Sequence, residues 1–251
     1  MASKAPGAGF AVVHDIDGPK VRLGAVWFAA TIAACFAGRP ALAVLMAAAV
    51  ACAADQVVRL HDPRAAAAVL EEPVRLVAVL GAASLPLAAA AGSDTLTGAC
   101  ALSVMAAACV GGGRSAVVVL GVLPLGLGAA APVLLHHLGT SAALVLLVLV
   151  AAYDAGDFLV GTGAGTTWEG PAAGVAAVAV AGFAFTVIGP PPVLEEGAAT
   201  AAVLVAMLAP LGPPLASLIV GDGATKARFV RRLDSLVLCG PVTAFVLAAL
   251  L

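Results

Sequence analysis

Charged residues are scarce in this chain of 251 residues: only 10% are Asp, Glu, Lys or Arg, whereas 63% are hydrophobic. A typical soluble domain is about one quarter charged and about half apolar, so a soluble fold of this size would expose too much apolar surface. The same hydrophobicity excludes intrinsic disorder. The composition therefore predicts an integral membrane protein whose main partner is the lipid bilayer.

The chain also lacks an excess of positive charge, having 12 Lys and Arg against 14 Asp and Glu. Binding of nucleic acid phosphates requires such an excess on one face, so a nucleic acid partner is excluded. The five cysteines lie in apolar runs without CxxC spacing or a neighbouring His, which indicates neither a disulfide framework nor a zinc site. The first twenty residues lack the apolar run of a signal peptide, and we expect this segment to be retained.

Long apolar runs are abundant, and a transmembrane helix needs roughly 20 such residues. Nine stretches are free of charge: 23–38, 40–54, 76–93, 95–113, 115–135, 138–153, 170–194, 197–221 and 235–251. They predict an all-α, polytopic bundle of about nine transmembrane helices. The first two are short and meet at Arg39, so a hairpin or a re-entrant pair is open there. Ala, Gly and Val dominate the spans, which favours close helix packing, although a GC-rich genome would select the same residues.

The cations are distributed unevenly over the predicted loops. Eleven of the 12 Lys and Arg residues fall on one side of the nine-span topology, and only Arg39 falls on the other. The positive-inside rule then places the N-terminus and the loops at 154–169 and 222–234 in the cytoplasm, in a protein of the cytoplasmic membrane. We divide the chain into a cytoplasmic segment at 1–22, N-terminal helices at 23–137 and a C-terminal region at 138–251.

Two polar segments interrupt this apolar chain at span boundaries. The first contains Asp154 and Asp157, which share a face if the helix continues through them. Paired carboxylates beside a low-dielectric core repel each other unless a cation or proton neutralises them, so a divalent metal is the natural occupant.

The second polar segment covers residues 221–235. Its cations are flanked by acids at both ends, the cations being Lys226, Arg228, Arg231 and Arg232 and the acids Asp222 and Asp234. Such a set could hold a phosphate-bearing group against a metal bound by the acids. The alternative is a basic anchor that touches anionic lipid headgroups.

In order and spacing, the two segments resemble the signature regions of the phosphatidate cytidylyltransferases. That family has Asp-x-Gly-Ala-Tyr-x-x-Gly at the end of a span, then Lys-Thr-Trp-Glu-Gly with a further Gly. Near the C-terminus it has a Gly and a Ser five residues apart, followed by Asp-Arg-x-Asp-Ser. The matching residues here are Asp154, Gly156, Gly161, Thr167, Trp168, Glu169, Gly170, Gly174, Gly212, Ser217, Arg232, Asp234 and Ser235. The resemblance covers 138–251. Thr166 replaces the Lys of the second motif, Arg231 replaces the first Asp of the last, and a Lys-Asp and a His-Gly-Gly are missing.

The resemblance implies transfer of a cytidylyl group from CTP to phosphatidate, which yields CDP-diacylglycerol and pyrophosphate with Mg²⁺ as cofactor. It assigns Asp154 and Asp234 to catalysis and metal binding, and we add Asp157 and Asp222 as substitute metal ligands. The substrate-binding residues by the same analogy are Lys226, Arg228, Arg232, Trp168, Glu169 and Ser217, of which Trp168 and Glu169 order their loop.

Two other functions stay open at this level. The missing motif residues favour a catalytically inactive homologue that serves as a structural or regulatory membrane subunit. A transporter would be expected to carry ionisable residues near mid-membrane, whereas these charges lie at span ends. A homodimer is also left open.

Overall fold

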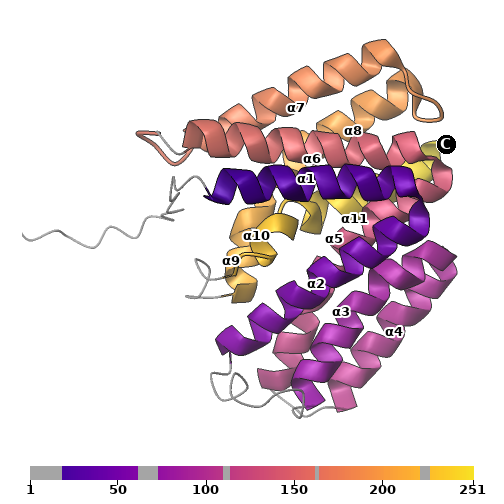
Figure 1. The fold of residues 1–251 in the computed structure, drawn as a ribbon, viewed down its shortest axis with the longest axis vertical. Coiled ribbons are helices and arrows are strands. Elements are labelled where there is room, and N and C mark those ends of the chain that lie inside the picture. The colour runs from indigo at the N-terminus through magenta and orange to yellow at the C-terminus, as the bar shows by residue number, and fades with distance from the viewer. Residues whose placement is uncertain (1–18, 62–72, 110–113, 162–163, 221–226) are drawn as a thin grey trace, which may run out of the picture.

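The computed structural model describes residues 19–61, 73–109, 114–161, 164–220 and 227–251 (Figure 1). Every regular element in these ranges is helical, which confirms the predicted all-α class. The elements are α1 (Pro19–Ala37), α2 (Arg39–His61), α3 (Pro73–Ala91), α4 (Ser93–Cys109), α5 (Arg114–Leu138), α6 (Thr140–Gly161), α7 (Glu169–Ile188), α8 (Leu194–Leu208), a 3₁₀ turn η1 (Ala209–Leu211), α9 (Gly212–Val220), α10 (Val230–Leu233) and α11 (Leu236–Leu250).

Each of the nine predicted spans corresponds to a helical segment. In the described ranges, seven segments are long and apolar enough to cross a bilayer: Arg39–Leu60, Pro73–Ala91, Gly121–Leu138, Thr140–Gly161, Glu169–Ile188, Leu194–Val220 and Val230–Leu250. Two shorter apolar helices, Arg22–Ala37 and Ser93–Cys109, complete the set. The chain is therefore an integral membrane protein with multiple spans.

Helix α2 is longer than the charge-free stretch at 40–54 from which it was predicted. It has 23 residues and continues through Asp55 and Arg59, which form an ion pair at 2.8 Å within the helix. Asp55 also binds Arg75 of α3 at 2.5 Å. Because the carboxylate has partners, its charge does not end the helix. Helices α1 and α2 contact each other as a helical hairpin around Gly38.

The connections differ between the two ends of the molecule. At one end, α1–α2, α3–α4, α5–α6 and α7–α8 are joined by short turns at glycines (Figure 1). Gly38 and Gly139 have φ values of +110° and +152°, a region that residues with a Cβ rarely adopt. The opposite ends of these helices lie along the other side of the molecule, where they spread apart (Figure 1).

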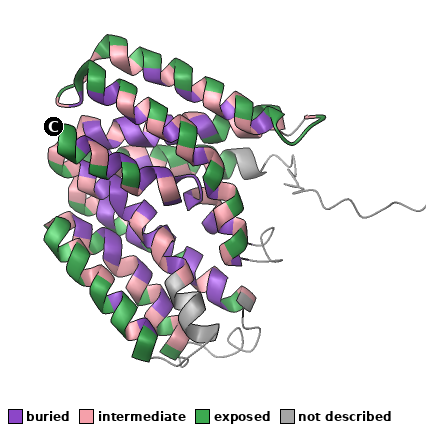
Figure 2. Cartoon of the chain, turned by 180° about the vertical axis from the view of Figure 1, so that it is seen from behind, coloured by how far each residue is buried: buried purple, intermediate pink, exposed green. Residues whose placement is uncertain are grey.

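The buried core lies where α5 and α6 meet the surrounding helices (Figure 2). Small residues allow backbones to come close there: a Cβ at Gly128 of α5 would lie 2.9 Å from the Leu236 carbonyl oxygen at the start of α11. This supports the predicted close packing. The boundary proposed at 137/138 falls beside the Gly139 turn, but α5 packs on α11 and α1 packs on α6, so the two regions form one bundle.

Large apolar side chains cover the outer face of the α7–α8 hairpin. Val180 and Phe183 of α7 are 73% and 72% exposed, and Met207 of α8 is 68% exposed. Such a surface is suited to lipid, because hydrocarbon chains are as apolar as the side chains themselves.

Candidate functional site

Helix α6 carries the first two acidic residues. It runs without a break to Gly161, so Asp154 and Asp157 are three residues apart on one helical face, as predicted. Tyr153, beside them, is only 1% exposed and anchors this part of α6 in the core.

Helix α7 approaches α6 through glycines of the motifs that carry the family resemblance. A Cβ at Gly156 would lie 2.7 Å from the Ala173 carbonyl oxygen, and one at Gly174 would lie 2.7 Å from the Tyr153 ring. At Gly170 a Cβ would lie 2.5 Å from Asp157 Oδ1. These glycines therefore hold α7 against the part of α6 that bears the two aspartates.

The second acidic segment lies between α10 and α11. Asp234 is 5% exposed and Ser235 is 3% exposed. Gly212, at the start of α9, packs directly on the Asp234 backbone, where a Cβ would overlap its carbonyl group. The polar pair thus sits at a close crossing of two chain segments.

Ser235 connects the two acidic segments. Its hydroxyl donates a hydrogen bond to Asp154 Oδ1 at 2.5 Å, across 81 residues of sequence. Its backbone N–H donates to Asp234 Oδ1 at 2.9 Å, and its Oγ lies 3.5 Å from the same oxygen. Asp154 and Asp234 are therefore both within hydrogen-bonding range of one hydroxyl.

Arginines accompany the two carboxylates. Arg231 Nη1 lies 3.9 Å from Asp234 Oδ2. The Arg232 guanidinium packs against α1, where its Nη1 would lie 3.1 Å from a Cβ at Gly24. Arg228, before α10, is exposed. The site consequently combines two acids with cations that can attract phosphate oxygens.

The two acids differ in accessibility. Asp234 is buried, whereas Asp154 is exposed. Of the two carboxylates, Asp154 is therefore the one at the surface of the helix bundle.

The side chain of Glu169 connects α7 to the loop that precedes it. The Glu169 carboxylate accepts hydrogen bonds from the Gly165 N–H at 3.3 Å and from the Thr166 hydroxyl at 3.0 Å. Trp168 is 78% exposed. Ser217 donates its hydroxyl to the Pro213 carbonyl at 2.8 Å within α9. These hydrogen bonds of Glu169 and Ser217 thus stabilise the segments to which the two residues belong.

Two predicted site residues, Asp222 and Lys226, lie outside the described residues. Within the described part, no three His, Cys, Asp or Glu side chains gather closely enough to hold a metal ion. Magnesium is commonly held by one or two carboxylates, with substrate phosphates and water completing its shell. Asp154 and Asp234, joined through Ser235, fit that requirement.

Sequence reasoning missed two features of the polar architecture. Ser235 was matched to a motif but not assigned to the site, and only its place in the fold reveals its bond to Asp154. The ion pairs of Asp55 with Arg59 and Arg75 were also missed. The spacing of Asp55 and Arg59 by four residues was the signal that could have revealed the first of these pairs.

The cations of the described residues separate along the membrane axis. Only Arg39 lies at the end with the glycine turns, and the others belong to helix ends or segments at the end that carries the acidic site: Lys20, Arg22, Arg59, Arg75, Arg114, Arg228, Arg231 and Arg232. The site and the basic residues therefore share one end of the bundle.

Comparisons of the chain with protein-family models, curated proteins and solved structures found no match. The family resemblance accordingly depends on the motif residues themselves.

Proposed function

We propose that this protein is a Mg²⁺-dependent membrane transferase that moves a cytidylyl group from CTP to phosphatidate. The observation that carries the proposal is the meeting of Asp154 and Asp234 at Ser235. These are the acidic residues to which the motif resemblance assigns metal binding. Two arginines, Arg231 and Arg232, precede Asp234 closely in the sequence.

The chemistry is an in-line displacement at phosphorus. An oxygen of the phosphatidate phosphate forms a bond to the α-phosphorus of CTP, and the bond from that phosphorus to the bridging oxygen of the β-phosphate breaks. Pyrophosphate leaves with the electron pair, and no proton transfer is required. A bound Mg²⁺ would neutralise triphosphate charge.

The chain's own residues would bind and orient the substrates. Asp154, on the open side, would meet the metal-bound triphosphate, with Asp234 and Ser235 fixing its position. Arg228 and Arg232 would neutralise phosphate oxygens, because a guanidinium pairs well with phosphate. Lys226 is proposed for the same role.

The location of the site supports a substrate pair of this kind. It lies at the cation-rich end of the bundle, which the positive-inside rule assigns to the cytoplasm. We therefore propose that the protein resides in the cytoplasmic membrane, where the lipid arrives within the inner leaflet and the nucleotide arrives from the cytosol.

The second candidate is a catalytically inactive homologue that acts as a membrane subunit. A specific observation favours it: Arg231 stands where the family motif has an Asp, and it pairs with Asp234 at 3.9 Å. A cation at that place competes with a metal for the carboxylate.

Production of labelled liponucleotide from CTP and phosphatidate tests the proposal, with the purified full chain in nanodiscs, with Mg²⁺ and with EDTA. We expect Mg²⁺-dependent product and a loss of about 100-fold or more in Asp154→Asn and Asp234→Asn, since even second-shell partners of a metal contribute 10- to 100-fold. Asp94→Asn is the matched control, because Asp94 is exposed in the first turn of α4 at the opposite end. No product from the wild type, or unchanged turnover in Asp234→Asn, contradicts the proposal.

A further inference from the structure

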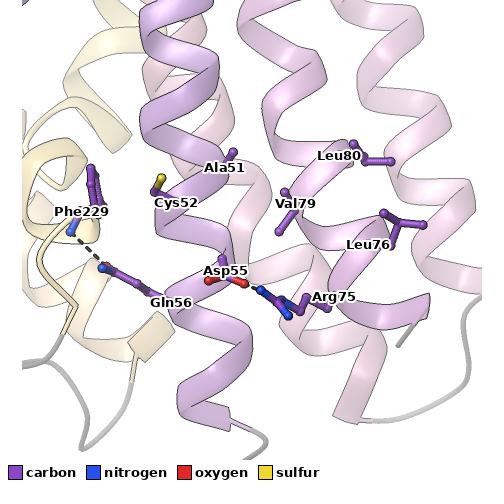
Figure 3. A pocket seen from close by; sticks show the side chains of 9 residues that line it. All are labelled: Ala51, Cys52, Asp55, Gln56, Arg75, Leu76, Val79, Leu80 and Phe229. Atoms are coloured by element: carbon purple, nitrogen blue, oxygen red, sulfur yellow. Dashed lines mark hydrogen bonds and ion pairs between the residues drawn. The ribbon is translucent and has the colours of Figure 1, made fainter. Parts of the chain in front are cut away.

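A groove separate from the Asp154–Asp234 pair lies between α2, α3 and the segment before α10 (Figure 3). Its volume is about 410 Å³, within the range of small-molecule sites. Phe229 closes one side, and its backbone N–H donates to Gln56 Oε1 at 3.0 Å, which fixes it to α2. The groove is thus bounded by three chain segments.

Polarity changes along the groove in one direction. Helix α2 runs toward the cation-rich end and α3 runs away from it, so Asp55, Gln56 and Arg75 lie nearer that end. The residues deeper in the bilayer region are Ala51, Cys52, Val79 and Leu80. A phospholipid in the adjoining leaflet has the same order, with its polar headgroup at the membrane surface and its acyl chains inward.

Arg59 does not line the groove but lies one helical turn beyond Asp55 on α2, and together with Arg75 it gives the polar end a net positive charge. Asp55 is bound by Arg59 at 2.8 Å and by Arg75 at 2.5 Å, so two guanidinium groups share one carboxylate. The Arg59 side chain is 45% exposed and can meet a further anion. With two guanidinium groups and one carboxylate, this end attracts a phosphate more than a cation, because the carboxylate is already paired and one positive charge is in excess.

The groove opens sideways on membrane-spanning helices. Leu76 and Leu80 of α3 are 42% and 58% exposed, and both α2 and α3 are long and apolar enough to cross the bilayer. A molecule that enters here comes from the bilayer, and the apolar walls suit hydrocarbon rather than a nucleotide.

We propose that this groove binds one anionic phospholipid, with its phosphate beside Arg59 and Arg75 and an acyl chain along Leu76, Val79 and Leu80. The site uses neither Asp154 nor Asp234. The inference is therefore independent of the proposed transferase activity, and either can fail alone.

Two native cysteines provide a test without mutation. Cys52 lines the groove, and Cys109, in the last turn of α4, is a matched exposed thiol outside it. The delipidated full chain in detergent is alkylated with N-ethylmaleimide in the presence of phosphatidylglycerol, of phosphatidylcholine with the same acyl chains, or of inorganic phosphate. Peptide mass spectrometry follows each cysteine.

We expect phosphatidylglycerol to slow alkylation of Cys52 at concentrations at which phosphatidylcholine does not, and to leave Cys109 unchanged. Arg59→Gln should raise the half-protecting lipid concentration about fivefold, the contribution of one arginine near an anionic surface. Arg22→Gln removes an exposed cation of α1 at the same end and should leave that concentration unchanged.

Three results overturn the inference: equal protection by phosphatidylcholine, equal protection of Cys109, or protection of Cys52 by inorganic phosphate alone. A second measurement uses the wild type and phosphatidylglycerol with a diazirine in one acyl chain. Crosslinks should map to 51–56 and 76–80, whereas crosslinks confined to α7 and α8 contradict the proposed groove.

Discussion

Ser235 donates its hydroxyl hydrogen bond to the carboxylate of Asp154 at 2.5 Å, although 81 residues separate them in the sequence. The same serine is bonded through its backbone to Asp234. This serine joins Asp154, within α6, to Asp234, just before α11, and its removal tests how much the joint polar centre stabilises the bundle.

Replacing Ser235 by Ala should destabilise the protein by about 1.5–3 kcal/mol, the usual contribution of a hydrogen bond to a charged group. Ser235→Thr should retain most of the stability because it keeps the hydroxyl. Ser217→Ala is the control, since the Ser217 hydroxyl bonds its own helix at Pro213, an interaction that contributes little to helix stability. Thermal unfolding in detergent measures all three, and equal losses for Ser235→Ala and Ser217→Ala contradict the prediction.

Gly174→Ala should weaken the contact between α6 and α7. The added Cβ would lie 2.7 Å from the Tyr153 ring, so the helices must move apart at a cost of about 1–3 kcal/mol. Gly98→Ala on α4 is the matched control, because nothing lies within 4 Å of its Cβ and alanine favours helix. The midpoints of thermal unfolding should fall for the first variant and stay or rise for the second; the reverse order disproves the role of Gly174.

His137 should be a neutral imidazole with its proton on Nε2. Arg39 Nη1 lies 2.7 Å from His137 Nδ1, and a guanidinium can only donate, so Nδ1 must accept. His137 Nε2 lies 2.9 Å from the Ala89 carbonyl oxygen and must donate. Nitrogen-15 chemical shifts of labelled histidine report the tautomer, and a proton on Nδ1 contradicts this arrangement. His136 provides an internal comparison, since its Nε2 faces the Cys35 carbonyl at 3.0 Å.

The proposed orientation predicts opposite labelling of the two ends. Ser93 and Thr167 are both exposed, the first at the end with the glycine turns and the second in the loop before α7. In a background without the native exposed cysteines, Ser93→Cys should react with a membrane-impermeant thiol reagent in intact cells. Thr167→Cys should react only after the membrane is permeabilised. Reaction of Thr167→Cys in intact cells reverses the orientation.

The spans and the shared face of Asp154 and Asp157 could be predicted from the sequence. In hydrocarbon a helix satisfies its backbone hydrogen bonds within itself, so the length of an apolar run nearly determines where a span lies. The helical repeat is equally local and fixes which residues three positions apart share a face.

The contacts between helices were decided by the tertiary structure. Asp55 pairs with Arg75 of α3, so α2 continues past Asp55, the charged residue before which the predicted span ended. Ser235 meets Asp154 because α11 packs against α5 and reaches α6 at its start, and a different set of contacts, at Gly156 and Gly174, brings α7 onto α6. Such contacts depend on how each helix is rotated and how it crosses its neighbours, which is set by the fit of side chains distant in sequence and not by any local pattern.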